Sequence, residues 1–231
     1  MDDKQFNISR FLQFLNERTS NFILKGGNAL VQCYDIPRLS DDIDLDCAKE
    51  NIVPHVDMYC SVLRIPYRVA KDTNLVKRCI LHLADGEKPL KIEVSYRNKI
   101  IDKTNVKKVN GINVYSIDQL AMMKAIAYMG RDRVRDLYDL SFICNKYYDE
   151  LSPQTVALIK ESVGKKGIEQ YDFVMQTDSD AASMKNNDAV MDMFLNMFDK
   201  LDLLSEKEHD VETVYNVPRK NNDGKDNANV R

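Results

Sequence analysis

The chain has 231 residues, 44% of them hydrophobic and 30% charged, and its formal net charge at pH 7 is −3. This length allows one substantial core or two small ones, and no apolar run approaches the roughly 18 residues that a membrane-spanning helix needs. The acidic balance excludes a strongly basic nucleic-acid-binding protein, so any contact with nucleic acid must come from a local patch.

The start of the chain and its cysteines predict an intracellular protein. Residues 1–6 lack the basic segment and the apolar stretch of a signal peptide. Five cysteines are present and no CxxC pair occurs, so neither a disulfide framework nor a cysteine zinc site is expected. We therefore expect a protein that is soluble, cytoplasmic and not associated with a membrane.

The first half of the chain is predicted to alternate helices with short strands. Residues 4–20 place apolar side chains at helical spacing on one face. The apolar segment 22–24, which two glycines end, is typical of a buried strand, and a helix is expected over 28–34. The other elements predicted here are a helix over 53–63, a turn at 85–87 and strands over 42–47, 67–70, 75–83 and 90–96.

The second half, from about residue 116, is predicted to be helical. Ser116 and Gln119 form the pattern of a capping box. Ser152 before Pro153 is typical of a helix start, and Gly164 is typical of a helix end. A long apolar stripe marks the last helix and consists of Val190, Phe194, Met197, Phe198, Leu201 and Leu204.

These patterns divide the chain into three parts. We predict an α+β fold, with a mixed α/β domain over residues 1–112 and an all-α helical domain over residues 113–205. Residues 206–231 are polar and lack apolar periodicity, so we expect them to form a disordered tail.

Two glycines stand between a predicted strand and a predicted helix, in the segment Lys25-Gly26-Gly27-Asn28. Glycine lets backbone N–H groups approach a ligand closely, and a helix N-terminus adds a partial positive charge that favours phosphate. Many strand-to-helix turns use glycine for geometry alone. This motif by itself leaves both interpretations open.

A pair of aspartates on a predicted strand suggests a metal site. Asp42 and Asp44 are two residues apart, so a strand places both carboxylates on one face. Two anions held so close repel each other unless a cation binds between them, and magnesium prefers such hard oxygen ligands. The alternative is a solvated acidic strand edge, with Asp41 and Asp46 as further surface charges.

Glu93 offers a third carboxylate. It lies on the predicted strand 90–96 and points away from the apolar side chains of that strand. If its face is the one that carries Asp42 and Asp44, the three carboxylates can hold two metal ions. The alternative is a surface glutamate that pairs with Lys91.

Two groups of residues resemble a known family. Residues 25–30 (KGGNAL) and 38–45 (RLSDDIDL) resemble the KGGTAL and RxSxDIDL signature of the AbiEii/AbiGii nucleotidyltransferases. These are the toxin components of type IV toxin–antitoxin systems, within the DNA polymerase β-like superfamily. Lys124, Arg131 and residues 135–140 (RDLYDL) are similar to that family's second motif. The matches span residues 25 to 140.

The resemblance implies a nucleotidyltransferase-like mixed β-sheet with flanking helices, followed by a helical domain. It implies transfer of a nucleoside monophosphate from an NTP, dependent on magnesium or manganese, to an RNA such as tRNA or to a protein, and an antitoxin as partner. The residues expected to hold two metal ions are Asp42, Asp44 and Glu93. Those expected to contact the nucleotide are Gly26, Gly27, Asn28, Ser40, Lys124 and Asp136.

One position departs from the family pattern. Residue 28 is Asn where Ser or Thr is usual. The amide of Asn28 can still donate a hydrogen bond to a phosphate, but a bulkier contact there puts nucleotide choice and rate in doubt.

A lysine amid apolar helical residues also needs an explanation. Lys124, Arg131 and Arg135 share one face if the predicted helix continues through Gly130, and such a cationic stripe would suit a triphosphate. The alternative is a solvated face on which Arg135 pairs with Asp139. The upstream motifs favour the functional interpretation for Lys124 and for Asp136.

Two classes of function follow. The first is an active nucleotidyltransferase, and the second is a catalytically idle nucleotide-binding module that acts through a protein partner. The presence of all three carboxylates favours the enzyme. A nucleic-acid-binding antitoxin is disfavoured, because the sequence shows neither a helix-turn-helix signal nor a basic surface.

Overall fold

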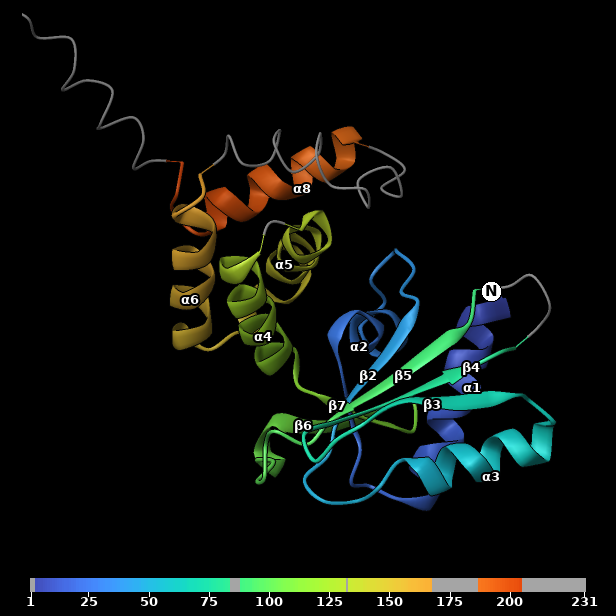
Figure 1. The fold of residues 1–231 in the computed structure, drawn as a ribbon. Helices are drawn as coiled ribbons and strands as arrows, with labels where there is room; N and C mark the ends of the chain where they lie inside the picture. The colour runs from blue at the N-terminus through green and yellow to red at the C-terminus, as the bar shows by residue number, and fades with distance from the viewer. Residues whose placement is uncertain (1–2, 84–87, 132, 168–186, 205–231) are drawn as a thin grey trace, which may run out of the picture.

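The computed structural model describes residues 3–83, 88–131, 133–167 and 187–204 (Figure 1). Within these residues, seven strands form one mixed sheet in the order β3-β4-β5-β2-β1-β7-β6. The strands are β1 (Ile23–Lys25), β2 (Asp42–Asp46), β3 (Tyr67–Asp72), β4 (Val76–Leu81), β5 (Leu90–Ser95), β6 (Val106–Val109) and β7 (Ile112–Tyr115). The pairs β2–β5 and β1–β7 are parallel, and the other neighbours are antiparallel.

Helices surround the sheet and then continue beyond it. The α-helices are α1 (Asp3–Arg18), α2 (Gly26–Cys33), α3 (Val53–Leu63), α4 (Ile117–Gly130), α5 (Val134–Tyr147), α6 (Pro153–Gly164) and α8 (Asn187–Lys200), and two short 3-10 turns are η1 (Lys103–Asn105) and η2 (Tyr148–Glu150). Figure 1 shows α4, α5, α6 and α8 gathered together to one side of the sheet. The described helices include none that is long and apolar enough to cross a membrane.

The alternation of apolar and acidic residues gives β2 one buried and one polar face. Ile43 and Leu45 are fully or almost fully buried, while Asp42 and Asp44 are partly exposed. On the apolar side, α1 packs against α3 through edge-to-face contacts of Phe11 and Phe14 with Tyr59, at ring centroid distances of 5.1 Å. The core therefore fixes which way the acidic face of β2 points.

The hairpin of β6 and β7 is a finding that the sequence analysis missed. The turn consists of Asn110 and Gly111, whose φ angles of 50° and 82° are both positive, as a tight two-residue hairpin turn requires. Val109 pairs with Ile112 across it. An Asn-Gly pair between short apolar segments was the available signal. The sheet thus ends at Tyr115, and the division into two domains at residue 112 stays a prediction.

Helix α4 does not continue through Gly130, and such a continuation was the condition for Lys124, Arg131 and Arg135 to share one face. Helix α4 ends at Gly130, Arg131 has an extended backbone with φ −157° and ψ 151°, and α5 begins at Val134. Glycine has a low helix propensity because it loses the most backbone freedom on folding, and here the chain turns after it. Lys124, Arg131 and Arg135 therefore do not share one helical face.

The predicted helix starts in the second half are confirmed. The hydroxyl of Ser116 accepts a hydrogen bond from the backbone N–H of Gln119 at 3.3 Å, and Ser152 does the same for Thr155 at 3.3 Å. Helix α6 ends at Gly164 as expected. The predicted turn at 85–87 and the predicted disordered tail 206–231 lie outside the described residues.

We expect Ser116→Ala to lower the free energy of unfolding by about 1 kcal/mol, since it removes the cap of α4. The melting temperature should fall by roughly 2–4 °C, measured by circular dichroism. Ser61→Ala, at an exposed position of α3, is the control and should change the melting temperature little. Equal melting temperatures for the two variants would show that the cap contributes nothing.

Candidate functional site

A cavity of about 760 Å³ lies between the polar face of the central strands β2 and β5 and the helices α4 and α5. This volume is in the range of small-molecule sites in proteins. Its wall includes Gly26, Gly27 and Ser40 from the first half of the chain. Eight Lys or Arg side chains and four Asp side chains also line it, an excess of four positive charges, although the whole chain has a net charge of −3.

The predicted aspartate pair opens onto this cavity. Asp42 and Asp44 both line it. Burial raises the pKa of the Asp44 carboxyl, and the nearby carboxylates of Asp42 and Glu93 raise it further, against the opposing effect of Lys91. The carboxylates of Asp42 and Asp44 therefore repel each other, as the spacing of the two residues predicts.

Glu93 lies beside the aspartates but not on the cavity wall. Strand β5 runs parallel to β2, and Glu93 is in register with Asp44, so the two side chains share one face of the sheet. The carboxylate of Glu93 is held by Arg78 on β4, at 2.7 Å from Nε and 2.6 Å from Nη2. Lys91 pairs instead with Asp42 at 2.6 Å, so Glu93 does not pair with Lys91.

The site offers two hard oxygen ligands for a metal ion, and not the three carboxylates that the sequence predicts. Among the described residues, no group of three His, Cys, Asp or Glu side chains is placed to hold a metal ion. Asp42 and Asp44 supply two carboxylates, and magnesium is commonly held by one or two carboxylates together with substrate phosphates. The aspartates thus fit one metal ion with a bound triphosphate. Glu93 would join only after leaving Arg78.

The two glycines make room at the start of α2. Gly26 has a φ of +71°, and a Cβ there would lie 3.0 Å from Oδ2 of Asp44. A Cβ on Gly27 would lie 2.7 Å from Oγ of Ser40 and 2.8 Å from Nη2 of Arg38. No side chain caps the helix at its N-cap, Lys25. The first backbone N–H groups of α2 therefore lie beside Asp44, at a position where they can donate hydrogen bonds to an anionic ligand.

Asn28 connects two backbone segments and does not line the cavity. Its side chain is fully buried, and Nδ2 donates hydrogen bonds to the backbone carbonyls of Ser40 at 3.2 Å and of Asp42 at 2.6 Å. Both amide protons are used, so its predicted hydrogen bond to phosphate does not fit this geometry. Asn28 instead joins the glycine turn, which consists of Gly26 and Gly27 at the start of α2, to the start of β2.

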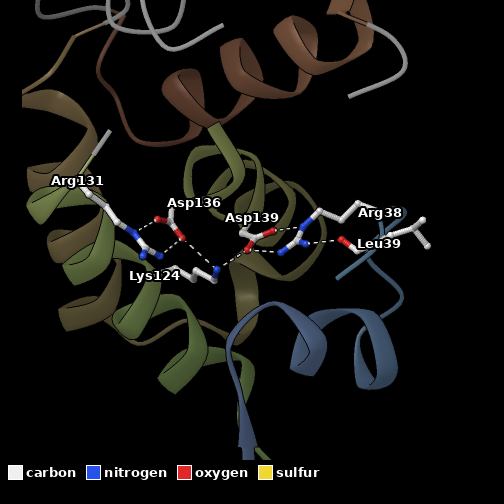
Figure 2. A network of polar contacts seen from close by, with 6 residues as sticks. All are labelled: Arg38, Leu39, Lys124, Arg131, Asp136 and Asp139. Carbon is white, nitrogen blue, oxygen red and sulfur yellow. Dashed lines mark hydrogen bonds and ion pairs between the residues drawn. The ribbon is translucent and has the colours of Figure 1, made fainter. Parts of the chain in front are cut away.

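Lys124 lies between two buried carboxylates (Figure 2). Its Nζ is 3.1 Å from Asp136 and 2.6 Å from Asp139. Arg131 binds Asp136 from the other side, at 2.7 Å through Nε and 3.2 Å through Nη2. Burial raises the pKa of the Asp136 carboxyl, but Lys124 and Arg131 outweigh burial and lower it overall. Asp136 therefore stays charged and orients both cations.

Arg38 connects this network of ion pairs to the first half of the chain. Its guanidinium donates to both carboxylate oxygens of Asp139 at 2.7 Å, and Nη1 donates to the carbonyl of Leu39 at 2.8 Å (Figure 2). The Asp139 side chain is fully buried and that of Arg38 is 8% exposed. Arg38 stands over Gly27, so the same contact joins the glycine turn to α5.

Sequence reasoning assigned no role to several charged residues of this site. Arg38 belongs to the RLSDDIDL segment, but no pattern along the chain indicated its partner 101 residues away. Arg78 and Lys91 reach the carboxylates only through the register of neighbouring strands. Arg133 lines the cavity from the segment between α4 and α5, where its spacing from Arg131 by two residues was the available signal.

Two variants should separate the buried from the exposed part of the network. Asp139→Asn leaves Arg38 and Lys124 without their shared carboxylate and should destabilise the protein by about 3–5 kcal/mol. Arg131→Gln removes a side chain that is 59% exposed and should cost about 1 kcal/mol or less. Urea unfolding of both variants measures this. Equal losses would show that burial does not set the strength of these pairs.

Comparison with known proteins identifies the family and the fold of the chain. Residues 10–217 match the family model described as nucleotidyl transferase AbiEii toxin, type IV toxin–antitoxin system. The curated proteins include no significant match.

Two solved structures from Helicobacter pylori have the same fold. JHP933 is 22% identical, with a TM-score of 0.70 over 92% of this chain and 96% of its own. A protein provisionally described as a nucleotidyltransferase is also 22% identical, with a TM-score of 0.71 over 91% of this chain and 98% of its own. The predicted nucleotidyltransferase-like fold is confirmed. The family match, which covers most of the sequence, shows that the chain belongs to the AbiEii family of nucleotidyltransferase toxins of type IV toxin–antitoxin systems.

Proposed function

We propose that this nucleotidyltransferase transfers a nucleoside monophosphate from an NTP to an acceptor, with the aid of magnesium or manganese, as the toxin of a toxin–antitoxin pair. The observation that carries the proposal is the cavity itself. On one side are Asp42, Asp44 and the uncapped start of α2, and on the other are Lys124, Arg131 and Asp136. A metal-bound triphosphate needs both a carboxylate pair and surrounding cations.

Each wall of the cavity has a distinct task in this proposal. The backbone N–H groups at Gly26 and Gly27 donate hydrogen bonds to phosphate oxygens, because both glycines line the cavity at the N-terminus of α2. Lys124 and Arg131 neutralise phosphate charge from the helical side, and Asp136 orients them. Fixed charges of this kind need no reorganisation when charge develops during transfer.

The metal would be held by Asp42 and Asp44, and Glu93 would complete a two-metal site on exchanging its partner Arg78. When bound, metal ions activate the attacking oxygen and stabilise charge on the leaving pyrophosphate. The excess of cationic side chains in the cavity favours an anionic acceptor such as an RNA, for example a tRNA, over a protein. A cytoplasmic location and an antitoxin partner are parts of the same proposal.

Asp44→Asn should reduce transfer at least about a hundredfold, since it removes a metal ligand and with it charge stabilisation in the transition state. It should also stabilise the metal-free protein, because burial and neighbouring carboxylates disfavour a charged Asp44. Asp42→Asn should likewise abolish transfer but give no such gain, since it loses the ion pair with Lys91.

The measurements are transfer from labelled NTPs to total cellular RNA and to total cellular protein, and thermal unfolding with and without magnesium and NTP. Asp192→Asn, exposed on α8, is the matched control and should behave as the wild type. If the wild type binds magnesium and NTP but labels neither RNA nor protein, the chain is an idle nucleotide-binding module. Full transfer by Asp44→Asn would refute the metal assignment.

Lys124→Ala should weaken NTP binding by roughly tenfold to a hundredfold, the worth of a lost charge-assisted hydrogen bond. Its effect on manganese binding in the absence of NTP should be smaller, because the aspartate pair remains. Lys107→Ala, an exposed lysine on β6, is the control. Titrations of NTP and of manganese, each followed by calorimetry, decide the matter, and an equal loss in both would contradict the role of Lys124.

A further inference from the structure

The carboxylates on the polar face of β2 and β5 differ in their partners. Lys91 binds Asp42 at 2.6 Å, Lys25 binds Asp46 at 2.5 Å, and Arg78 binds Glu93. The described residues include no hydrogen bond or ion pair to Asp44. Within the part of the chain that the structure describes, Asp44 is thus the member of this face that has no ion pair of its own, although Lys91 and Lys25 act on it electrostatically.

Lys91 has a central place among these carboxylates. It is in register with Asp42 on the neighbouring strand and two residues before Glu93, which is in register with Asp44. All four side chains therefore share one face of the sheet. Burial lowers the pKa of Lys91, but Asp42, Asp44 and Glu93 outweigh burial and raise it overall. Its ammonium group thus interacts electrostatically with both aspartates and with the glutamate.

This is the region where a divalent cation would be held. Two carboxylates at this spacing need a cation between them, and an ammonium group cannot share that space with a metal ion. The side chain of Lys91 is 32% exposed and reaches the cavity wall, so it has solvent-filled space into which to move. A lysine side chain, with its four rotatable carbons, can change partner at low cost.

We propose that Lys91 is an internal counterion of the aspartate pair, which a divalent metal ion must displace from Asp42 in order to bind. The inference rests on the proposed function, because it takes Asp42 and Asp44 as the metal ligands. The displaced ammonium remains at the cavity wall, beside the cations that would face the triphosphate. Lys91 therefore opposes binding of the metal alone and favours binding of the nucleotide.

Other lysines of the cavity do not share this position. Lys4 and Lys88 pair with Asp41, at 3.3 Å and 3.1 Å, and Asp41 precedes β2. The side chain of Lys88 is 79% exposed, so solvent screens its charge. Lys88 is thus a matched control, being a lysine on the same cavity that contacts neither proposed metal ligand.

The test is manganese binding, followed by electron paramagnetic resonance of the free ion, to the full-length wild type and to Lys91→Gln, Lys91→Arg and Lys88→Gln. Removal of a unit positive charge next to a divalent ion should tighten manganese binding by about tenfold in Lys91→Gln. Lys91→Arg keeps the charge and should bind as weakly as the wild type or more weakly. Lys88→Gln should change the affinity by less than about twofold.

A second titration separates a counterion from a merely structural residue. Binding of a nucleoside triphosphate in excess chelator, without metal, should become weaker in Lys91→Gln, because the positive charge that offsets Asp42 at the cavity wall is lost. A variant with a distorted site would bind both ligands more weakly. Opposite changes in the two affinities are therefore the expected result.

Two outcomes would overturn the proposal. If the wild type binds manganese and Lys91→Gln binds it equally or more weakly, Lys91 is not a counterion that the metal displaces, and the proposed function is untouched. If neither the wild type nor any variant binds manganese, even with a nucleoside triphosphate present, the metal assignment of the proposed function fails, and this inference fails with it. Unfolding curves of all variants confirm that the comparison is made between folded proteins.

Discussion

The buried ion pair of Arg38 with Asp139 is the contact on which the arrangement of the site depends. It joins the connection between α2 and β2 to helix α5, two parts of the chain that are 101 residues apart. Burial of a charged pair has a large desolvation cost, and a bidentate geometry with further hydrogen bonds offsets it. Because Lys124 shares Asp139, the orientation of α4 relative to the glycine turn follows from the same carboxylate.

The distribution of charge in the site follows from this connection. The first half of the chain presents the acidic face of β2, and the helical half presents arginines together with Lys124. The first half also contributes the cations Lys4, Arg38, Lys88 and Lys91, so the cavity receives positive charge from both halves and the proposed metal ligands from the first half. The net charge of −3 conceals this arrangement, since the cavity has an excess of positive charge. Composition is therefore a poor guide to the ligand of this protein, and local geometry is a better one.

Local patterns predicted much of the fold. The structure has the corresponding elements at the period-2 alternation of 42–47, at the glycine pair that begins α2 and at the serines at 116 and 152. Such signals depend on residues a few positions apart, so they can be recognised without tertiary information. The β6–β7 hairpin was missed although its Asn-Gly turn is a local signal. Helix α4 ends at Gly130, a residue type with low helix propensity.

The sequence by itself determined which residue types stand on which face of which element, and its family motifs indicated the kind of chemistry. Only the tertiary structure decided which charges meet. Strand register brings Lys91 to Asp42 and Arg78 to Glu93, and packing of the two halves brings Arg38 to Asp139. The amide N–H groups of the buried Asn28 side chain likewise donate to two backbone carbonyls. The physical reason is that electrostatic partners are chosen by distance in space, which depends on the register of strands and the docking of helices, and neither can be derived from spacing along the chain.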